Sequence, residues 1–248
     1  MNTYKRKNIL LVTIGSAGDV YPFLGLAVGL KQRGHRVTLV TSMYFQEAVK
    51  KEGIDFIPIG TREDYLNIIQ NPDLWDPQKS MKFYGTEVVG QLIRPMYKII
   101  TDYMNNKGNA ILIAQGLVFA AQIAHEIHEY PFISLHLQPG VFRSVYDMPL
   151  LPGWLPRTVL KVIFNLLDTL MLDPALTPSL NEFRAELGLG PVTKIADQWI
   201  HSPQKTIGLF DDWFSPMQPD WPPQTELTGF IFYDPNQDAP FPKKYANF

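Results

Sequence analysis

The sequence begins its regular structure with NILLVTI (residues 8–14), which runs directly into GSAGDVYP (residues 15–22). The first segment is rich in apolar and β-branched residues, as in a buried strand, and the second is a glycine-rich turn. Apolar residues at helical spacing follow from Tyr21 to Arg33, and Gly34 stands where helices often end in the left-handed conformation. A strand, a turn and a helix in this order predict the first unit of a parallel α/β sheet.

The same alternation continues along the chain and predicts the fold class. We expect further strands at residues 36–41, 54–59, 110–114, 131–136, 206–210 and 226–228. We expect helices at residues 21–33, 44–51, 80–105 (kinked or restarted at Pro95), 118–129, 158–172 and 179–187. Strands and helices that alternate with short links predict an α/β fold, a Rossmann-like doubly wound parallel sheet flanked by helices.

The composition excludes several classes of function. The chain has 248 residues, with 22 Lys and Arg against 24 Asp and Glu, so its formal net charge is −2. Because a nucleic-acid-binding protein normally carries a basic excess, we predict no nucleic-acid partner. The absence of cysteine excludes disulfides, thiol catalysis and cysteine-ligated zinc, and it fits a cytoplasmic protein. The longest uncharged apolar stretch, residues 110–124, has 15 residues, whereas a bilayer span needs about 20.

The turn at residues 15–22 carries the strongest chemical signal. Gly15 and Gly18 allow the backbone to approach a ligand closely, and Asp19 supplies a carboxylate. In a doubly wound sheet the ligand binds at the carboxyl ends of the strands, where this turn lies. Asp19 could take a proton from a substrate hydroxyl as a general base, or it could cap the helix, and the two roles are compatible.

Two nucleotide-binding motifs are missing from this turn. A dinucleotide site needs Gly-x-Gly-x-x-Gly and an acidic residue at the end of the second strand, which here ends Val40-Thr41-Ser42. A P-loop needs Gly-Lys followed by Ser or Thr, which the sequence also lacks. A nucleotide-dependent oxidoreductase is therefore only a remote alternative.

Several segments resemble the N-terminal half of GT-B glycosyltransferases. They are GSAGDV (15–20), RGHRVTLVT (33–41), NEFR (181–184), LGL (187–189), WPPQT (221–225) and TGF (228–230). The sequence is most similar to the sterol glucosyltransferase and the glycopeptide or macrolide glycosyltransferase group, and the resemblance covers essentially the whole chain. It implies one half of a GT-B fold, in which two Rossmann-like domains face a cleft.

The resemblance also implies how the chain is organised. Residues 1–230 would form the acceptor-binding domain, and residues 231–248 would be a connector or tail toward a C-terminal donor-binding domain that this sequence lacks. Residues 202–242 hold eight of the 21 prolines, which fits a wrapped connector. Such a half on its own is expected to transfer sugar poorly or not at all.

The resemblance further implies an inverting transferase that moves a hexose from a nucleotide sugar to a hydroxyl of an apolar or lipid-like acceptor. Asp19 would be the catalytic base, and Gly15, Ser16, Gly18 and His136 would contact acceptor or donor. The nucleotide sugar would be a co-substrate bound mostly by the C-terminal domain, and we predict no other cofactor and no metal. The alternative is a non-catalytic domain of the same fold that binds a small ligand or a partner chain.

The histidines have several alternative roles. His136 ends the fifth predicted strand, on the same sheet edge as Asp19. There it would line the acceptor cleft or, alternatively, bind the loop at residues 138–156. His125 and His128 are three residues apart on a predicted helix, a spacing that can share a metal, but the sequence offers no third ligand.

One strongly apolar segment, residues 154–171, has three interpretations. Arg157 and Lys161 lie near its start. The segment is a helix packed on the sheet, the wall of an apolar acceptor pocket, or a helix on a membrane surface with snorkelling basic residues. We therefore predict a cytoplasmic protein, with peripheral membrane association as an open alternative.

Overall fold

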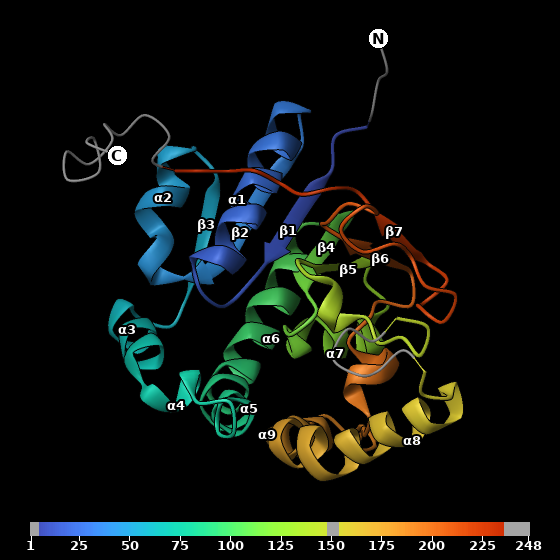
Figure 1. The fold of residues 1–248 in the computed structure, drawn as a ribbon. Coiled ribbons are helices and arrows are strands. Elements are labelled where there is room, and N and C mark those ends of the chain that lie inside the picture. Colours follow the sequence, from blue (N-terminus) through green and yellow to red (C-terminus); the bar gives the residue numbers. More distant parts are fainter. Residues whose placement is uncertain (1–4, 148–153, 236–248) are drawn as a thin grey trace, which may run out of the picture.

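The computed structural model describes residues 5–147 and 154–235. In these residues seven parallel strands form one sheet in the order β3-β2-β1-β4-β5-β6-β7, with helices packed against it (Figure 1). The strands are β1 (Asn8–Val12), β2 (Arg36–Ser42), β3 (Asp55–Ile59), β4 (Ala110–Gln115), β5 (Phe132–His136), β6 (Lys205–Gly208) and β7 (Thr225–Leu227). The predicted fold class is confirmed, and each expected strand is present within one or two residues of its predicted position.

Helices follow each of the first five strands, and within the described residues none lies between β6 and β7. They are α1 (Ala17–Gln32), α2 (Gln46–Lys51), α3 (Arg62–Gln70), α4 (Pro72–Trp75), α5 (Ser80–Phe83), α6 (Gly90–Asn106), α7 (Phe119–His128), α8 (Arg157–Leu167) and α9 (Asp173–Glu186). A π-helical turn, Asp168–Leu172, joins α8 directly to α9, so the two helices that the sequence predicts there form one continuous helical run.

The strand order reverses at the centre of the sheet. β1 pairs with both β2 and β4, so the chain builds one side from β1 to β3 and then returns to build the other from β4 to β7. In open α/β sheets the carboxyl ends of the strands at such a point form a crevice in which ligands bind. Here the crevice lies between the turn that follows β1 and the end of β4.

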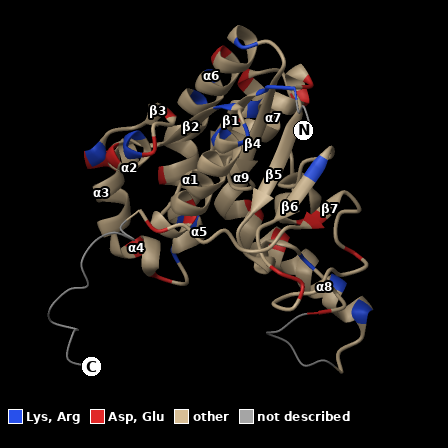
Figure 2. Ribbon diagram, turned by 90° about the horizontal axis from the view of Figure 1, so that it is seen from above, with Lys and Arg blue, Asp and Glu red and all other residues tan. Residues whose placement is uncertain are grey.

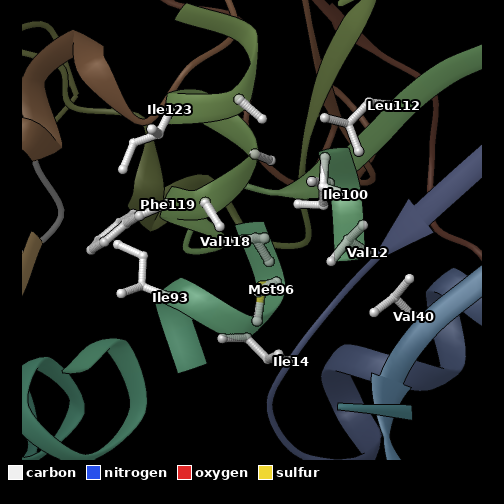
Figure 3. Close-up of a cluster of buried hydrophobic side chains, with 14 of the residues drawn as sticks. Val12, Ile14, Val40, Ile93, Met96, Ile100, Leu112, Val118, Phe119 and Ile123 are labelled. Carbon is white, nitrogen blue, oxygen red and sulfur yellow. The ribbon is translucent and has the colours of Figure 1, made fainter. Parts of the chain in front are cut away.

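Two apolar cores lie on opposite faces of the sheet. One includes Ile100 from α6, Ile123 from α7 and Leu112 of β4, and Figure 3 shows Ile100 beside Leu112 and Ile123 beside Phe119. The other core includes Phe23 of α1 and Val49 of α2. Because both faces are covered, the strands are apolar along most of their length rather than alternating.

Helix α1 begins earlier than the sequence predicts. Its first residue is Ala17 instead of Tyr21, and Ser16 is the N-cap. The residue after Ser16 already has helical geometry, because Asp19 accepts the hydrogen bond that closes the first turn. Asp19 therefore lies inside the first turn of the helix, and Pro22 lies within the helix instead of at its start.

The helix predicted at residues 80–105 is interrupted by a π-helical turn at Tyr84–Val89. Pro95 was expected to kink or restart this helix, but α6 continues through it. The wider turn accommodates the close approach of α9, because a Cβ on Gly85 would lie 1.9 Å from the backbone oxygen of Ala175. The interruption therefore reflects packing between helices, which local sequence rules do not register.

The segment after β7 crosses back over the sheet to α1 and α2 (Figure 1). Ile231 and Tyr233 pack against the α1 side of the core, and the Tyr233 hydroxyl donates a hydrogen bond to Glu52 Oε1 at 2.8 Å. Residues 231–235 thus lie against the domain that precedes them. The predicted boundary at residue 230 stays a prediction, since residues 236–248 lie outside the described part of the chain.

The structure describes residues 138–147 and 154–156 of the predicted loop, and residues 148–153 lie outside the described part of the chain. The loop contains a short 3-10 turn at Pro139–Val141. Across the described ranges, no helix is both long and apolar enough to cross a membrane.

Candidate functional site

The carboxylate of Asp19 is held at the carboxyl end of β1. Its Oδ2 atom accepts a hydrogen bond from the Ser16 backbone N–H at 2.8 Å and another from the Ser16 hydroxyl at 3.1 Å. The helix N-terminus also favours a negative charge at this position. The capping role weighed from the sequence is therefore real, although Ser16 is the N-cap and Asp19 is the third residue of the helix.

Gly15 is required at the tightest point of this turn. Its φ angle of 126° is one that L-residues rarely adopt, and a Cβ there would lie 2.3 Å from Asp19 Oδ2. The position thus has no room for a side chain while Asp19 keeps its conformation. Gly18 meets no such restriction, because a Cβ there would lie 3.5 Å from Ser16 Oγ.

Gln115, at the end of β4, holds the second oxygen of the carboxylate. Its amide oxygen accepts from the Ile14 backbone N–H at 3.3 Å and from the Thr13 hydroxyl at 3.1 Å. Since a backbone N–H can only donate, the amide NH2 is turned toward Asp19, and it donates to Asp19 Oδ1 at 2.9 Å. Gln115 therefore fixes the carboxylate from β4, the strand next to β1.

We expect Gln115→Glu to destabilise the protein at neutral pH by about 1–3 kcal/mol, because it replaces a buried donor with a second carboxylate. The loss should shrink below about pH 5, where one carboxylate of the pair takes up a proton. Urea unfolding at several pH values measures the effect. Gln115→Leu, which removes the donor without adding charge, should destabilise the protein without this recovery, and identical pH profiles for the two variants would argue against the contact.

A cavity of about 310 Å³ opens beside Asp19 and is called the Asp19 cavity below. Its polar lining includes Gly15, Ser16 and Asp19 from the turn, with Gln115 beside them. The apolar lining comes from several elements and includes Ile14, Ile59, Ile68, Ile69, Leu74, Trp75, Val88, Leu92 and Leu117. A carboxylate in the lining of a mostly apolar cavity suits a molecule with an apolar body and a hydroxyl group.

Three further ionisable side chains, Asp64, Tyr65 and Tyr84, line this cavity, and burial raises the pKa of Tyr65. Burial raises the pKa of the Tyr84 hydroxyl, with a smaller contribution from the charge of Asp19, and the hydroxyl donates to the Leu117 carbonyl at 3.3 Å. Hydrogen bonds from Thr61 lower the pKa of Asp64, which is the third residue of α3. Tyr84 therefore stays neutral and Asp64 stays charged at neutral pH.

His136 lies apart from this cavity. It is buried, with 2% of its surface exposed, and its Nε2 atom lies 2.9 Å from His201 Nδ1. The structure thus brings Gly15, Ser16 and Asp19 together but leaves His136 and Gly18 outside the lining of the Asp19 cavity. The ligand-binding role of His136 stays a prediction, and its observed partner is His201, together with the ring of Phe142 in the loop at residues 138–156.

Burial makes this histidine pair sensitive to acid. Burial lowers the pKa of His201 to about 4, and burial and the nearby His201 hold the pKa of His136 well below its ordinary 6.5. Below about pH 6.5 the unfolded chain takes up protons that the folded protein does not. The free energy of unfolding therefore decreases as the pH is lowered.

We therefore expect the free energy of unfolding to fall by up to about 2 kcal/mol per histidine between pH 7 and pH 5. Urea unfolding at both pH values measures this loss. His201→Phe, whose ring can keep the stack on Phe142, should show a smaller pH dependence than the unchanged protein. An equal pH dependence in the two proteins would contradict this assignment.

His125 and His128 contact aromatic residues separately. His125 Nδ1 donates to the Tyr130 carbonyl at 2.8 Å, and His128 Nε2 lies 3.0 Å from the Tyr97 hydroxyl. Within the described residues, no group of three or more His, Cys, Asp or Glu side chains could hold a metal ion.

Comparison with known proteins identifies the family of this chain. Residues 9–147 match the glycosyltransferase family 28 N-terminal domain. A UDP-sugar-dependent glycosyltransferase 52 of Dictyostelium discoideum is 25% identical over 95% of this chain and 14% of its own length. A sterol 3-beta-glucosyltransferase of Arabidopsis thaliana is 24% identical, over 92% of this chain and 38% of its own length.

A third relative, the O-mycaminosyltylonolide 6-deoxyallosyltransferase of Streptomyces fradiae, is 24% identical over 95% of this chain and 57% of its own. The chain therefore spans between about a seventh and somewhat more than half of the length of these relatives.

Solved structures show the same architecture. The glycosyltransferase of kitacinnamycin superposes with a TM-score of 0.65 at 16% identity, covering 97% of this chain and 56% of its own. The calicheamicin glycosyltransferase CalG4 superposes with a TM-score of 0.60 at 18% identity, covering 91% of this chain and 52% of its own. The chain belongs to the glycosyltransferase family 28 N-terminal domain family, and its fold is the Rossmann-like half of a GT-B glycosyltransferase.

Proposed function

We propose that this chain is the acceptor-binding half of an inverting glycosyltransferase, which moves a hexose from a nucleotide sugar to a hydroxyl of an apolar or lipid-like acceptor. The observation that carries the proposal is the fixed carboxylate of Asp19 in the lining of a mostly apolar cavity of about 310 Å³. This cavity lies at the carboxyl edge of the sheet, where β1 and β4 adjoin.

The hydrogen bonds around Asp19 favour one of its two oxygens as the proposed base. A carboxylate has about four acceptor sites, two on each oxygen. Oδ2 already accepts two hydrogen bonds from Ser16, whereas Oδ1 accepts one from Gln115. Asp19 Oδ1 therefore keeps one site for an acceptor hydroxyl.

The proposed reaction uses Asp19 Oδ1. The acceptor O–H proton passes to Asp19 Oδ1 while the oxygen attacks the anomeric carbon, and the bond from that carbon to the nucleotide phosphate breaks. The nucleoside diphosphate leaves with the electron pair of that bond. A single in-line displacement inverts the anomeric carbon, because the nucleophile and the leaving group lie on opposite sides.

The relatives support the choice of both substrates. One is named as dependent on UDP-sugars, and the solved glycosyltransferase SsfS6 was crystallised with thymidine diphosphate, which supports a nucleotide-sugar donor. Several are named sterol 3-beta-glucosyltransferases, which supports an apolar alcohol as acceptor. The donor would be bound mostly by a C-terminal domain outside this chain, with Gly15 and Ser16 close to the reacting groups.

The test is sugar transfer by a protein in which this chain is joined to its donor-binding half, offered UDP- and TDP-sugars with a panel of apolar alcohols that includes a 3-hydroxysterol. We expect glycoside formation with inverted anomeric configuration, at a rate that a metal chelator leaves unchanged. Saturable binding of the alcohols with no transfer from any donor would instead indicate a non-catalytic binding domain. A product of retained configuration would exclude the single-displacement mechanism.

A further inference from the structure

A second cavity, of about 190 Å³, lies beside the segments that lead into β6 and β7 and is called the His201 cavity below. It is lined by Gln198 and His201 before β6, by Asp220 and Trp221 before β7, and by Arg143 from the loop after β5. None of its lining residues lines the Asp19 cavity. A single water needs a cavity of only about 10–15 Å³, so the His201 cavity has room for a larger molecule.

Two buried nitrogen atoms at this cavity have no hydrogen-bond partner among the described residues. They are Nε2 of His201, a residue that is 3% exposed, and Nε1 of Trp221, which is 6% exposed. Buried polar atoms normally have a partner, and leaving one without a partner costs free energy. Both atoms belong to residues that line the cavity, so a molecule bound there can supply the missing partners.

The two rings are held in place by their neighbours. Phe142 stacks on His201 with ring centroids 5.1 Å apart, and on Trp221 with ring centroids 4.6 Å apart. The other ring nitrogen of His201, Nδ1, lies 2.9 Å from His136 Nε2. Because these contacts fix both rings, the two nitrogens without partners keep their orientation.

The hydrogen-bonding capacity of the two nitrogens indicates a hydroxyl group as their partner. The indole N–H of Trp221 can only donate, so its partner must accept. Burial lowers the pKa of His201 to about 4, so its ring is neutral at neutral pH. Its Nε2 atom then donates or accepts according to which of the two histidines, His136 or His201, donates in their mutual hydrogen bond. A hydroxyl group suits both nitrogens, because its oxygen accepts and its hydrogen donates.

The charges around the cavity are unfavourable for an anion. Arg143 is paired with the buried Asp168 at 2.5 Å, whereas Asp197 and Asp220 add two carboxylates to the lining. An adjoining hollow of about 400 Å³ has equal numbers of basic and acidic lining residues, which are Arg143, Lys161 and Lys194 against Asp168, Asp197 and Asp220. Lys161 comes from α8, whose basic positions are blue in Figure 2. A site for phosphate or for a carboxylate would instead present an excess of cations.

We propose that the His201 cavity binds a neutral polyhydroxylated molecule of the size of one sugar ring, with Trp221 Nε1 and His201 Nε2 as hydrogen-bond partners of its hydroxyl groups. The carboxylate of Asp220 accepts one hydrogen bond on each oxygen, from Ser144 and from the Val145 backbone N–H, and it can accept further ones from the ligand. A free sugar and a sugar already attached to a larger molecule both offer this chemistry. Binding here uses no residue of the Asp19 cavity and requires no sugar transfer, so it is tested independently of the proposed function.

The test follows the indole N–H signals of the 248-residue chain by NMR while glucose, galactose, mannose or their methyl glycosides are added. The chain has five tryptophans, and the signal that Trp221→Phe removes is that of Trp221. We expect at least one of these sugars to shift this signal with saturation, at a Kd of about 1 mM or tighter. Inorganic phosphate should leave the signal unchanged. Binding of the methyl glycoside as well as the free sugar would identify a site open to attached sugars, and binding of the free sugar alone would identify a site for free sugars.

Two matched variants test the role of the indole N–H. Trp221→Phe keeps an aromatic ring for the stack on Phe142 but removes the N–H, so it should bind the sugar at least about tenfold more weakly, as measured by saturation-transfer NMR of the ligand. Trp213→Phe makes the same change at a side chain that is 77% exposed and lines neither cavity, and it should leave the affinity unchanged. Circular dichroism and thermal unfolding verify that both variants fold.

Three results would overturn the proposal. The first is that no sugar or methyl glycoside shifts the Trp221 signal, which would mean that the cavity takes up water only. The second is that inorganic phosphate shifts this signal and the sugars do not. The third is that folded Trp221→Phe binds the sugar as tightly as the unchanged chain does. The first two results are read from the unchanged chain, so they do not depend on the folding of a variant.

Discussion

Asp19→Asn should lower kcat for sugar transfer by about 10²–10⁴ and change KM for the acceptor only a few-fold. General-base catalysis contributes about this factor, and the asparagine oxygen can still accept a hydrogen bond from the acceptor hydroxyl. The measurement is steady-state kinetics on a protein in which this chain is joined to a donor-binding half, as in the proposed function. The NH2 group of the asparagine cannot accept a hydrogen bond from Ser16 or Gln115. We therefore also expect a loss of about 1 kcal/mol in stability.

Asp102→Asn is the matched control for this prediction. Asp102 lies on α6, where it is exposed and pairs with Lys98 at 2.6 Å. The control makes the same chemical change away from the Asp19 cavity, so kcat should be retained. If Asp19→Asn keeps more than a tenth of the activity of the unchanged protein while remaining folded, Asp19 is not the base.

Gly15→Ala should reduce transfer about as strongly as Asp19→Asn and should also destabilise the protein by about 1–3 kcal/mol. A Cβ at this position would lie 2.3 Å from Asp19 Oδ2, so the carboxylate must move. Displacement of a catalytic group by about 1 Å is enough to lose about a hundredfold in rate. The stability loss comes from the φ angle of 126°, which strains any residue other than glycine.

Gly34→Ala separates these two effects. Gly34 also has a positive φ, 89°, but an added Cβ there would meet no atom within 4 Å. This variant should therefore lose stability by a similar amount and keep its transfer rate. Kinetics and urea unfolding of both variants measure the difference, and equal rates for Gly15→Ala and Gly34→Ala would show that the turn does not position the base.

The sheet was predictable from sequence because its signals are local. Each strand is a short apolar run beside a turn, and the links between strand and helix are short, so the parallel order follows from the handedness of the crossovers. The helices were less predictable where contacts between distant segments change the backbone. The π-helical turn around Gly85, which accommodates the Ala175 backbone, is such a case.

The site was only partly predictable for the same reason. The turn at residues 15–19 has a local signature, which indicated the carboxylate and its neighbours. Gln115 lies 96 residues beyond Asp19, and its one local signal was a polar residue at the end of an apolar strand. His136 was expected at the cleft because it ends a strand, yet its partner, His201, comes from a segment with no distinctive pattern.

The central claim is that Asp19 accepts a hydrogen bond from a hydroxyl group bound in the Asp19 cavity. It is tested most directly by the affinities of the 248-residue chain for a 3-hydroxysterol and for the matching 3-ketosterol, in the unchanged protein and in Asp19→Ala. Trp75, which lines the cavity and is 68% exposed, serves as the fluorescent reporter, and Trp75→Phe identifies its signal among the five tryptophans.

The unchanged chain should bind the alcohol at least about tenfold more tightly than the ketone, because only the alcohol can donate to the carboxylate. Asp19→Ala should abolish this preference and leave the affinity for the ketone nearly unchanged. Equal affinities of the unchanged chain for the two sterols, or a preference for the alcohol that survives in Asp19→Ala, would contradict the claim.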